Sequence, residues 1–219
     1  MAVSLTALSV LSCSGTNTGS YANKKSASLA NSPFRSSTLR DKDLLKINSL
    51  VVLPIDTSSR DVLSPVGAEN IYHDLHQSLS KELELKIIAG DDVSNKVPIR
   101  TRQLNSSDAI KLAAEFGADA ALVTSFNSYQ ERSGSRAGTE QPAKVDFSMS
   151  IYRTSDGREV WQASYHFSDD AWTDNLFQIA QKVKTRQGRG FLTAGELVQD
   201  GFDQAAKDFN QRRRQQFSK

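Results

Sequence analysis

The chain has 219 residues, of which 38% are hydrophobic and 24% are charged, a composition typical of an ordinary soluble protein. Its 27 basic side chains nearly balance its 25 acidic ones. This balance excludes a strongly electrostatic nucleic-acid-binding protein, because such domains concentrate basic charge. A single cysteine excludes an intramolecular disulfide and a cysteine-cluster zinc site, and no apolar run is long enough to predict an ordinary transmembrane helix.

The first twelve residues form an uncharged segment of apolar and small residues that ends at the lone Cys13. The motif Val10-Leu11-Ser12-Cys13 resembles the lipobox of bacterial lipoproteins: an aliphatic residue, a permissive position, a small residue and the cysteine. The resemblance implies that the Cys13 sulfur carries a diacylglycerol group. It also implies that the signal segment 1–12 is removed and that the new amino terminus is acylated. Two or more acyl chains anchor a protein stably, whereas one chain binds a membrane only marginally.

Two neighbouring features refine this prediction. A secretory signal begins with a positive region, but no Lys or Arg precedes Lys24, so we expect the natural start to lie upstream of Met1. Residue 14 is Ser, whereas Asp at this position commonly signals inner-membrane retention among such lipoproteins. The resemblance therefore implies a lipid anchor at the periplasmic face of the outer membrane, if the host has two membranes. The alternative is a cytosolic protein whose N-terminus has no targeting role.

The sequence divides into four parts. After the signal segment, residues 13–45 are rich in Ser, Asn, Thr and Gly and bury too little apolar surface to offset their ordering entropy, which predicts a flexible tether behind the lipidated Cys13. Residues 46–211 carry the periodic patterns of one globular domain. Residues 212–219 form a basic tail.

The first half of the domain alternates predicted strands and helices. The apolar run 50–55 predicts a buried strand, and Ser64-Pro65 then marks the start of a helix. A second strand is predicted at 85–88 and a second helix from Asn105 to Gly117, which ends it in a left-handed conformation. The predicted inward-facing side chains are Ile71, Leu75, Leu79 and Leu83 of the first helix, and Ile110, Ala113, Ala114 and Phe116 of the second.

The second half begins with strands. A strand is predicted at 120–129, followed by a loop over 130–144. Strict apolar–polar alternation over 145–152 and 161–167, on either side of Asp156-Gly157, predicts an antiparallel hairpin. A short helix is predicted around 176–183. A capping box at 193–196 opens a long final helix whose narrow face of small and aromatic residues suits close packing on a sheet.

This order, β-α-β-α-β-β-β-α-α, predicts an α/β (α+β) single domain with a mixed sheet and helices packed mainly on one face. The pattern resembles the amino-terminal domain of TolB and its relatives, which include the curli-secretion lipoprotein and the lipoprotein activator of penicillin-binding proteins. The resemblance is carried by the segments 49–56, 66–67, 118–123 and 145–167 and covers residues 47–210. It implies a binding module and leaves the partner open.

No motif predicts catalysis, a cofactor or a metal site. His73 and His76 are three residues apart, but both lie off the apolar stripe of their helix and are interpreted as solvated. The segment 134–138 lacks the serine spacing of a nucleophile elbow, and 188–190 is too short for a phosphate loop. The carboxylate pairs 91–92 and 169–170 lie in predicted turns that face water. We therefore expect a protein that is not an enzyme.

Two basic features remain as interaction candidates. Arg132 and Arg136 lie in a glycine-containing loop, where binding functions concentrate. The run 212–214 ends the last helix, where cations favour the helix dipole; the alternative is contact with an anionic polymer or lipid headgroups. Trp161 and Trp172 are expected in or beside the core.

The sequence thus predicts a lipid-anchored periplasmic binding or accessory module that acts on an envelope protein and binds no nucleic acid. The alternative is a secreted or periplasmic hydrolase whose site is assembled only in three dimensions. A deep pocket that gathers Asp, Glu or His side chains would favour the hydrolase.

Overall fold

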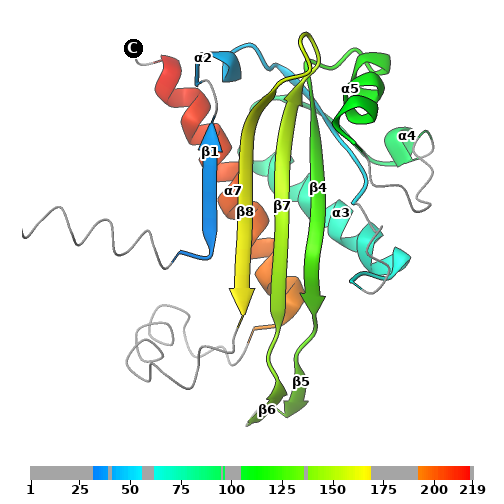
Figure 1. Cartoon of the computed structure of the whole chain (residues 1–219), viewed down its shortest axis with the longest axis vertical. Helices are drawn as coiled ribbons and strands as arrows, with labels where there is room; N and C mark the ends of the chain where they lie inside the picture. Colours follow the sequence, from blue (N-terminus) through cyan, green and yellow to red (C-terminus); the bar gives the residue numbers. More distant parts are fainter. Residues whose placement is uncertain are drawn as a thin grey trace, which may run out of the picture. The chain divides into compact units, whose positions relative to one another are not determined.

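The computed structural model describes residues 32–38, 41–55, 62–94, 96, 105–135, 138–168 and 192–217. Cys13, Arg136, Trp172 and the predicted helix around 176–183 lie outside these ranges. The described body, from Pro33 onward, is built on a six-stranded mixed sheet with the strand order β1-β8-β7-β4-β2-β3 (Figure 1). This architecture confirms the predicted α/β (α+β) class with a single sheet.

The parallel half of the sheet follows the predicted order. Strand β2 (Ser49–Val52) lies between β3 (Lys86–Ile88) and β4 (Ala120–Gln130) and is parallel to both. Helix α3 (Pro65–Glu82) links β2 to β3; α4 (Asp91–Ser94) and α5 (Ser106–Glu115) lie between β3 and β4. The predicted caps form, since the Ser64 and Asn105 side chains accept N–H groups from the first turns of α3 and α5.

The antiparallel half contains the predicted hairpin. Strand β7 (Lys144–Arg153) pairs with β4 on one side and with β8 (Glu159–Ser168) on the other. Gly157 supplies the turn with a φ of +69°, a conformation that glycine adopts without a steric penalty. In place of the predicted loop, β5 (Ser133–Ser135) and β6 (Gly138–Gln141) form a second, two-stranded sheet.

The domain begins earlier than predicted. Strand β1 (Phe34–Thr38) pairs antiparallel with β8, and α2 (Asp41–Leu44) follows it. Leu44 and Ile47 are fully buried, and β1 and α2 belong to the fold, so the prediction of a tether is wrong for residues 34–38 and 41–45. We call residues 34–38 and 41–47 the N-terminal strap. Its polar sequence resembles a linker, but long-range contacts hold it in place.

The last helix also extends beyond residue 211, the predicted end of the domain. Helix α7 (Ala194–Phe217) continues into the expected basic tail as far as Phe217. The predicted capping box forms at its start, where the backbone N–H of Thr193 donates to Glu196 Oε2 at 3.0 Å and that of Glu196 to Thr193 Oγ1 at 3.1 Å. Residues 212–217 are therefore helical and form no separate tail.

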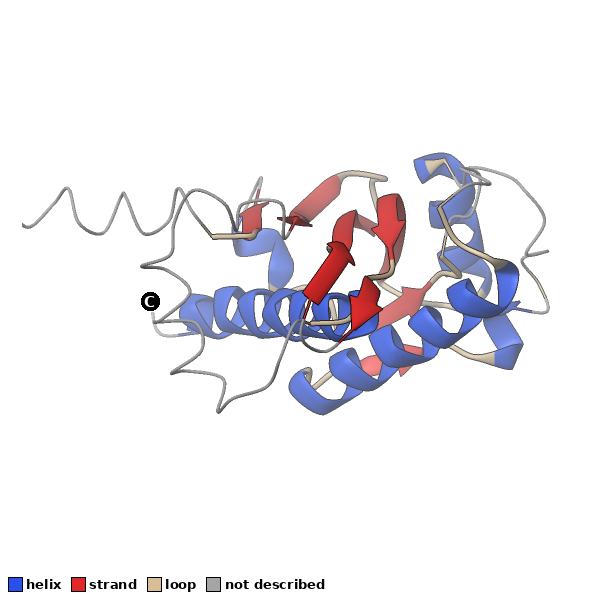
Figure 2. Ribbon diagram, turned by 90° about the horizontal axis from the view of Figure 1, so that it is seen from below, coloured by secondary structure: helices blue, strands red, loops and turns tan. Residues whose placement is uncertain are grey.

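The two long helices α3 and α7 cover one face of the sheet, which we call the covered face (Figure 2). Alternate strand residues point into this layer, and the largest of them are fully buried: Leu50, Leu122, Phe147, Trp161 and Tyr165. A smaller cluster lies on the opposite side of β2 and β4, under α4 and α5: Val51, Leu53, Val93, Ala109, Ala113, Ala118 and Ala121. The prediction for the second helix was wrong at Ala114, which is exposed, while Ala109 takes the inward position.

Gly201 allows α7 to approach the sheet closely. A methyl group at this position would lie 2.6 Å from Cζ of Phe147 and 2.9 Å from Cδ2 of Tyr165. The Phe147 ring stacks on Tyr165 and meets the Phe202 ring edge-on, at centroid distances of 5.4 and 5.1 Å. The small-and-aromatic face predicted for the last helix therefore packs on the sheet as expected.

Candidate functional site: the open face of the sheet

Beyond the carboxyl ends of the parallel strands β2 and β3, in the region where α/β proteins most often bind ligands, the Tyr72 side chain of α3 makes two hydrogen bonds. Its hydroxyl donates to the carbonyl oxygen of Val52 at 2.9 Å and accepts from the backbone N–H of Gly90 at 3.0 Å. The Tyr72 side chain thus joins the ends of β2 and β3 and is itself buried. The candidate functional surface lies elsewhere on the sheet.

The two edge strands carry features that discourage strand addition. On β1, the Arg212 guanidinium donates to Ser36 Oγ at 2.8 Å and to the Ser36 carbonyl oxygen at 3.4 Å. Asp208 holds this guanidinium through its Nε at 2.8 Å. On the opposite edge, β3 has only three residues and begins with the exposed Lys86. Short edge strands and edge cations are common protections against sheet extension.

The surface that remains is the side of β1, β8, β7 and β4 that points away from α3 and α7 (Figure 1). The register arranges its side chains in rows across the strands. Arg35, Ser164, Ser148 and Ser125 form one row; Ser37, Gln162 and Ser150 form the next; His166 and Asp146 form a third. We call these three rows the open face, and their residues are half-buried or exposed.

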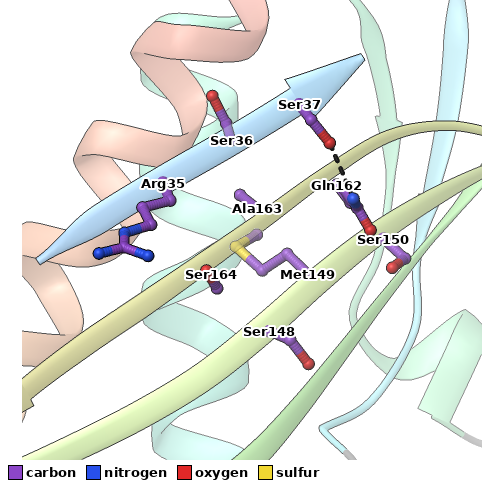
Figure 3. A pocket seen from close by; sticks show the side chains of 9 residues that line it. All are labelled: Arg35, Ser36, Ser37, Ser148, Met149, Ser150, Gln162, Ala163 and Ser164. Atoms are coloured by element: carbon purple, nitrogen blue, oxygen red, sulfur yellow. Dashed lines mark hydrogen bonds between the residues drawn. The ribbon is translucent and has the colours of Figure 1, made fainter. Parts of the chain in front are cut away.

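A shallow hollow of about 280 Å³ lies on the open face over β1, β8 and β7 (Figure 3). Ser37 Oγ accepts a hydrogen bond from Gln162 Nε2 at 2.8 Å within it. Serine side chains are short, which leaves the surface low between the larger neighbours. Nine described residues line the hollow, and among these nine Arg35 is the one ionisable residue: Arg35, Ser36, Ser37, Ser148, Met149, Ser150, Gln162, Ala163 and Ser164.

The third row carries the acidic group of this surface. Asp146 accepts hydrogen bonds from Asn127 Nδ2 at 3.0 Å and contacts His166 Nδ1 at 2.9 Å, so three strands meet at this carboxylate. The His166 side chain is 64% exposed. Within the described ranges, no three His, Cys, Asp or Glu side chains are grouped so that they would hold a metal ion. His73 and His76 lie on α3, apart from this cluster; His73 is exposed as expected, whereas His76 is half-buried.

The basic run at the end of α7 is engaged within the fold. Arg213 is 7% exposed and donates to the carbonyl oxygens of Leu44 and Ile47 at 3.3 and 2.9 Å. Burial lowers the pKa of Arg213. Arg214 pairs with Glu84 at 2.9 Å. Arg212 and Arg213 therefore fasten the N-terminal strap and are not an interaction tail.

A third arginine holds the other side of the strap. Arg153, at the end of β7, pairs with Asp43 of α2 at 2.6 Å and with Asp156 of the following turn. Hydrogen bonds from Arg153 lower the pKa of Asp43 and lower that of Asp156 to about 2. Asp156 and Asp43 in turn raise the pKa of Arg153.

The sequence-predicted interaction residues are only partly visible. Arg132 is half-buried immediately before β5, and Arg136 lies outside the described residues. Trp161 is in the core as expected, where its Nε1 donates to Asp208 at 3.0 Å. Sequence reasoning missed the open face as a site, although the serines that alternate with apolar residues in β7 and β8 were a visible signal for it.

Comparisons with known proteins show the fold. No protein-family model and no curated protein sequence matches the chain. Among solved structures, PelC of Paraburkholderia phytofirmans, described as a dodecamer, matches with a TM-score of 0.52 and 11% identity, over 81% of this chain and 96% of that one. At this identity the match shows a shared fold and no more.

Two lipoproteins are also among the structural neighbours. Lipoprotein GNA1162 of Neisseria meningitidis has a TM-score of 0.34 and 18% identity, over 64% of this chain and 94% of that one. The LpoB C-terminal domain of Salmonella enterica has a TM-score of 0.36 and 14% identity, over 59% of this chain and 93% of that one. The neighbours thus include members of the lipoprotein group that the sequence resembles. Within the described part of the chain, no helix combines the length and the apolar character needed to cross a bilayer.

Proposed function

We propose that this chain is a non-catalytic accessory module of the bacterial cell envelope that binds a partner protein through the open face. We further propose that lipid on Cys13 anchors it to the outer membrane on the periplasmic side. The lipobox resemblance supports the anchor, and the lipoproteins among the structural neighbours suit the same setting.

One observation carries the binding role. The Tyr72 hydroxyl joins Val52 and Gly90 beyond β2 and β3, whereas a polar surface over β1, β8, β7 and part of β4 faces away from α3 and α7. The hollow on that surface is shallow and is lined by small polar side chains with one arginine. This surface suits contact with another macromolecule better than enclosure of a small substrate, which proteins usually bind in deeper, mostly apolar pockets.

The docking role is tested by photocrosslinking in the intact envelope. A photoreactive residue at Ser164, in the open face, is expected to capture a discrete protein, whereas one at the exposed Gln211 of α7 is the matched control. A bulky Ser148→Trp substitution is expected to abolish capture from position 164. Equal capture from both positions, or capture unaffected by Ser148→Trp, would count against docking at this face.

The anchor is tested separately. Cys13→Ala is expected to release the protein from membranes into the soluble periplasmic fraction, because the described domain has no apolar helix that would retain it. Mass spectrometry of the mature wild-type protein should show a lipid-modified Cys13 as its first residue. A bare thiol, or full membrane retention of the variant, would contradict the lipid anchor.

A second role, as a subunit of a closed assembly, is favoured by the match to the PelC dodecamer. Ring assemblies arise when one surface of a subunit binds a different surface of the next copy. Analytical ultracentrifugation of the detergent-solubilised protein distinguishes the two roles. A single large species supports the assembly subunit, and a monomer supports the accessory module.

A further inference from the structure

We propose that the strand β1 is exchanged between two copies of this chain, so that β1 of each copy pairs with β8 of the other. Such exchange goes beyond the docking role of the open face and does not depend on it. Three observations support it: the specific contacts that hold β1, the separate fastening of α2, and the short connection between these two elements.

β8 and α7 recognise β1 through both its backbone and its side chains. All five residues of β1 are paired with β8 in antiparallel register. On the covered face, the Arg212 guanidinium of α7 donates to the Ser36 and Thr38 hydroxyls at 2.8 and 3.4 Å. On the open face, Gln162 Nε2 donates to Ser37 Oγ at 2.8 Å, the bond drawn in Figure 3. A second copy presents the same β8 and α7, so it fits β1 equally well.

Exchange re-forms the contacts that β1 makes with the rest of the domain. Because these contacts are the same within one copy and between two copies, their energies cancel when the closed monomer is compared with the exchanged pair. The balance then depends on the connection to α2, on the entropy of association and on new contacts between the copies. For this reason, exchange of an identical element is a low-cost route to a dimer.

The strand β1 is buried less than α2, which follows it in the chain. Each of the five β1 residues is half-buried or exposed, whereas Leu44 at the end of α2 and Ile47 just beyond it are fully buried. Arg213 donates to the carbonyl oxygens of both, and Arg153 pairs with Asp43. Detaching β1 therefore exposes less apolar surface than detaching α2, so we expect α2 to stay on its own copy.

The connection between β1 and α2 is short. Two residues separate Thr38, the last residue of β1, from Asp41, the first residue of α2. Short hinge segments favour exchange of the element that they carry. Because α2 stays in place, the exchanged strand remains near its own domain, and the two copies meet along the β1 edge of the sheet, related by a two-fold axis.

Detachment of β1 also creates the surface that captures the other copy. The strand order places β8 next to β1 at the edge of the sheet (Figure 1), so removal of β1 leaves backbone groups of β8 ready to pair with another strand. In the exchanged pair, Arg35 and Ser37 in the rows of each open face belong to the other copy. Each open face is then built from two chains.

The test traps the exchanged strand with a disulfide between two copies of the full chain, in which Cys13→Ser removes the native cysteine. One copy carries Ser37→Cys, and the other, labelled with ¹⁵N, carries Gln162→Cys. These positions are directly opposite each other in the register, and opposite residues of antiparallel strands have the Cα separation that a disulfide needs. After mixing at high concentration and oxidation, we expect a disulfide between a labelled and an unlabelled chain, identified by mass spectrometry.

Two controls use the same chemistry. A mixture of Ser37→Cys with Gln211→Cys, an exposed position on α7, reports disulfides that form by random collision and should give far less product. A chain that carries both Ser37→Cys and Gln162→Cys, oxidised while dilute, holds β1 on its own β8. Analytical ultracentrifugation should show that this chain stays monomeric where the unmodified protein forms dimers, and that reduction restores the dimers.

The contact from Arg212 gives a second measurement. Arg212→Ala should accelerate formation of the mixed disulfide about tenfold, because losing hydrogen bonds from a charged group lowers the barrier to detachment. The equilibrium fraction of dimer should stay the same, since the contact is lost from both forms. Arg214→Ala removes a pair with Glu84 outside the N-terminal strap and should leave the rate unchanged. Circular dichroism confirms that each variant is folded.

Several results would overturn the inference. These are a yield of mixed disulfide no greater than in the Gln211→Cys control, dimers formed by the oxidised double variant, or equal acceleration by Arg212→Ala and Arg214→Ala. If the first pair of cysteine variants fails to fold, Arg35→Cys and Ser164→Cys, the neighbouring opposite pair, provide the same measurement. The disulfide identifies the chain that supplies β1, so its outcome is independent of photocrosslinking at the open face.

Discussion

The two faces of the same strands differ in what their side chains do. On the covered face, β4, β7 and β8 present Phe126, Phe147 and Tyr165, whose rings pack against one another and against α7. On the open face, the residues between them are serines, Gln162, His166 and Asp146. Because successive side chains of a strand point to opposite faces of the sheet, the same strands supply both the apolar covered face and the polar open face. The covered face determines stability, and the open face is left available for contacts.

The largest expected effect lies at the centre of the covered face. Phe202→Ala removes a fully buried ring that contacts Phe147 and Phe126. We expect a loss of about 3–5 kcal/mol in the free energy of unfolding, from lost burial and the cavity left behind. Urea denaturation followed by circular dichroism measures this loss. A loss below about 1 kcal/mol would mean that α7 does not pack on the sheet as described.

A second prediction concerns polar contacts made from the same helix. Arg213→Met removes the donors to the buried carbonyl oxygens of Leu44 and Ile47. We expect a loss of about 1–3 kcal/mol, because acceptors left without partners retain their desolvation cost. The replacement keeps an apolar chain of similar length. Hydrogen exchange should show faster exchange in the strap than in β7, and uniform acceleration would contradict a local role.

A third prediction tests how closely α7 approaches the sheet. Gly201→Ala places a methyl group 2.6 Å from the Phe147 ring. Overpacking costs about 1–3 kcal/mol, which the better helix propensity of alanine offsets by about 1 kcal/mol. We expect a net loss. Gly195→Ala, near the start of the same helix, is the matched control, since its nearest atom would be 3.9 Å away; a destabilised control with an unaffected Gly201→Ala would refute the close approach.

The acid dependence of stability tests the strap from its other side. Asp43 and Asp156 have folded-state pKa values below the ordinary value for Asp, about 2 for Asp156. As the pH falls, the unfolded chain binds protons first, so the stability from these groups is present above about pH 4 and is lost as the pH falls toward 2. Arg153→Met should destabilise the protein at neutral pH and flatten this dependence. Denaturation curves between pH 2 and 6 compare the two proteins.

The smallest expected effect is on the open face. Ser148→Ala and Gln162→Ala remove side chains that the core does not use, so we expect stability changes within about 0.5 kcal/mol. Thermal melting measures the change. A loss comparable to that of Phe202→Ala would abolish the distinction between the two faces.

The patterns that were local in sequence were predicted well. Alternation over 145–152 and 161–167 predicted β7 and β8 and their inward residues, and the capping box predicted the start of α7. These predictions were confirmed because each of these features depends on a few adjacent residues. The open face appeared in the same pattern as the polar side of a hairpin. Its row structure required the pairing of β1 with β8, which the sequence did not indicate.

The N-terminal strap was missed for a physical reason. The sequence Phe34-Arg-Ser-Ser-Thr38 is too polar to predict a strand, and its stabilising partners are far away in the chain. Arg212 and Arg213 were interpreted as cations at a helix end, which is where they lie. Their acceptors on Ser36, Leu44 and Ile47 follow only from the tertiary structure. Asp43, paired with Arg153, was likewise part of an expected tether.

The N-terminal strap also constrains the order in which the strands of the sheet can assemble during folding. Ser36 and its partner Arg212 are 176 positions apart in the chain, and Ile47 and Arg213 are 166 apart. A growing polypeptide therefore exposes its first strand long before the arginines that secure it have been synthesised. Closing so large a loop is slow compared with forming local hairpins. We expect β4, β7 and β8 to assemble first, and β1 to join only when the end of α7 has arrived.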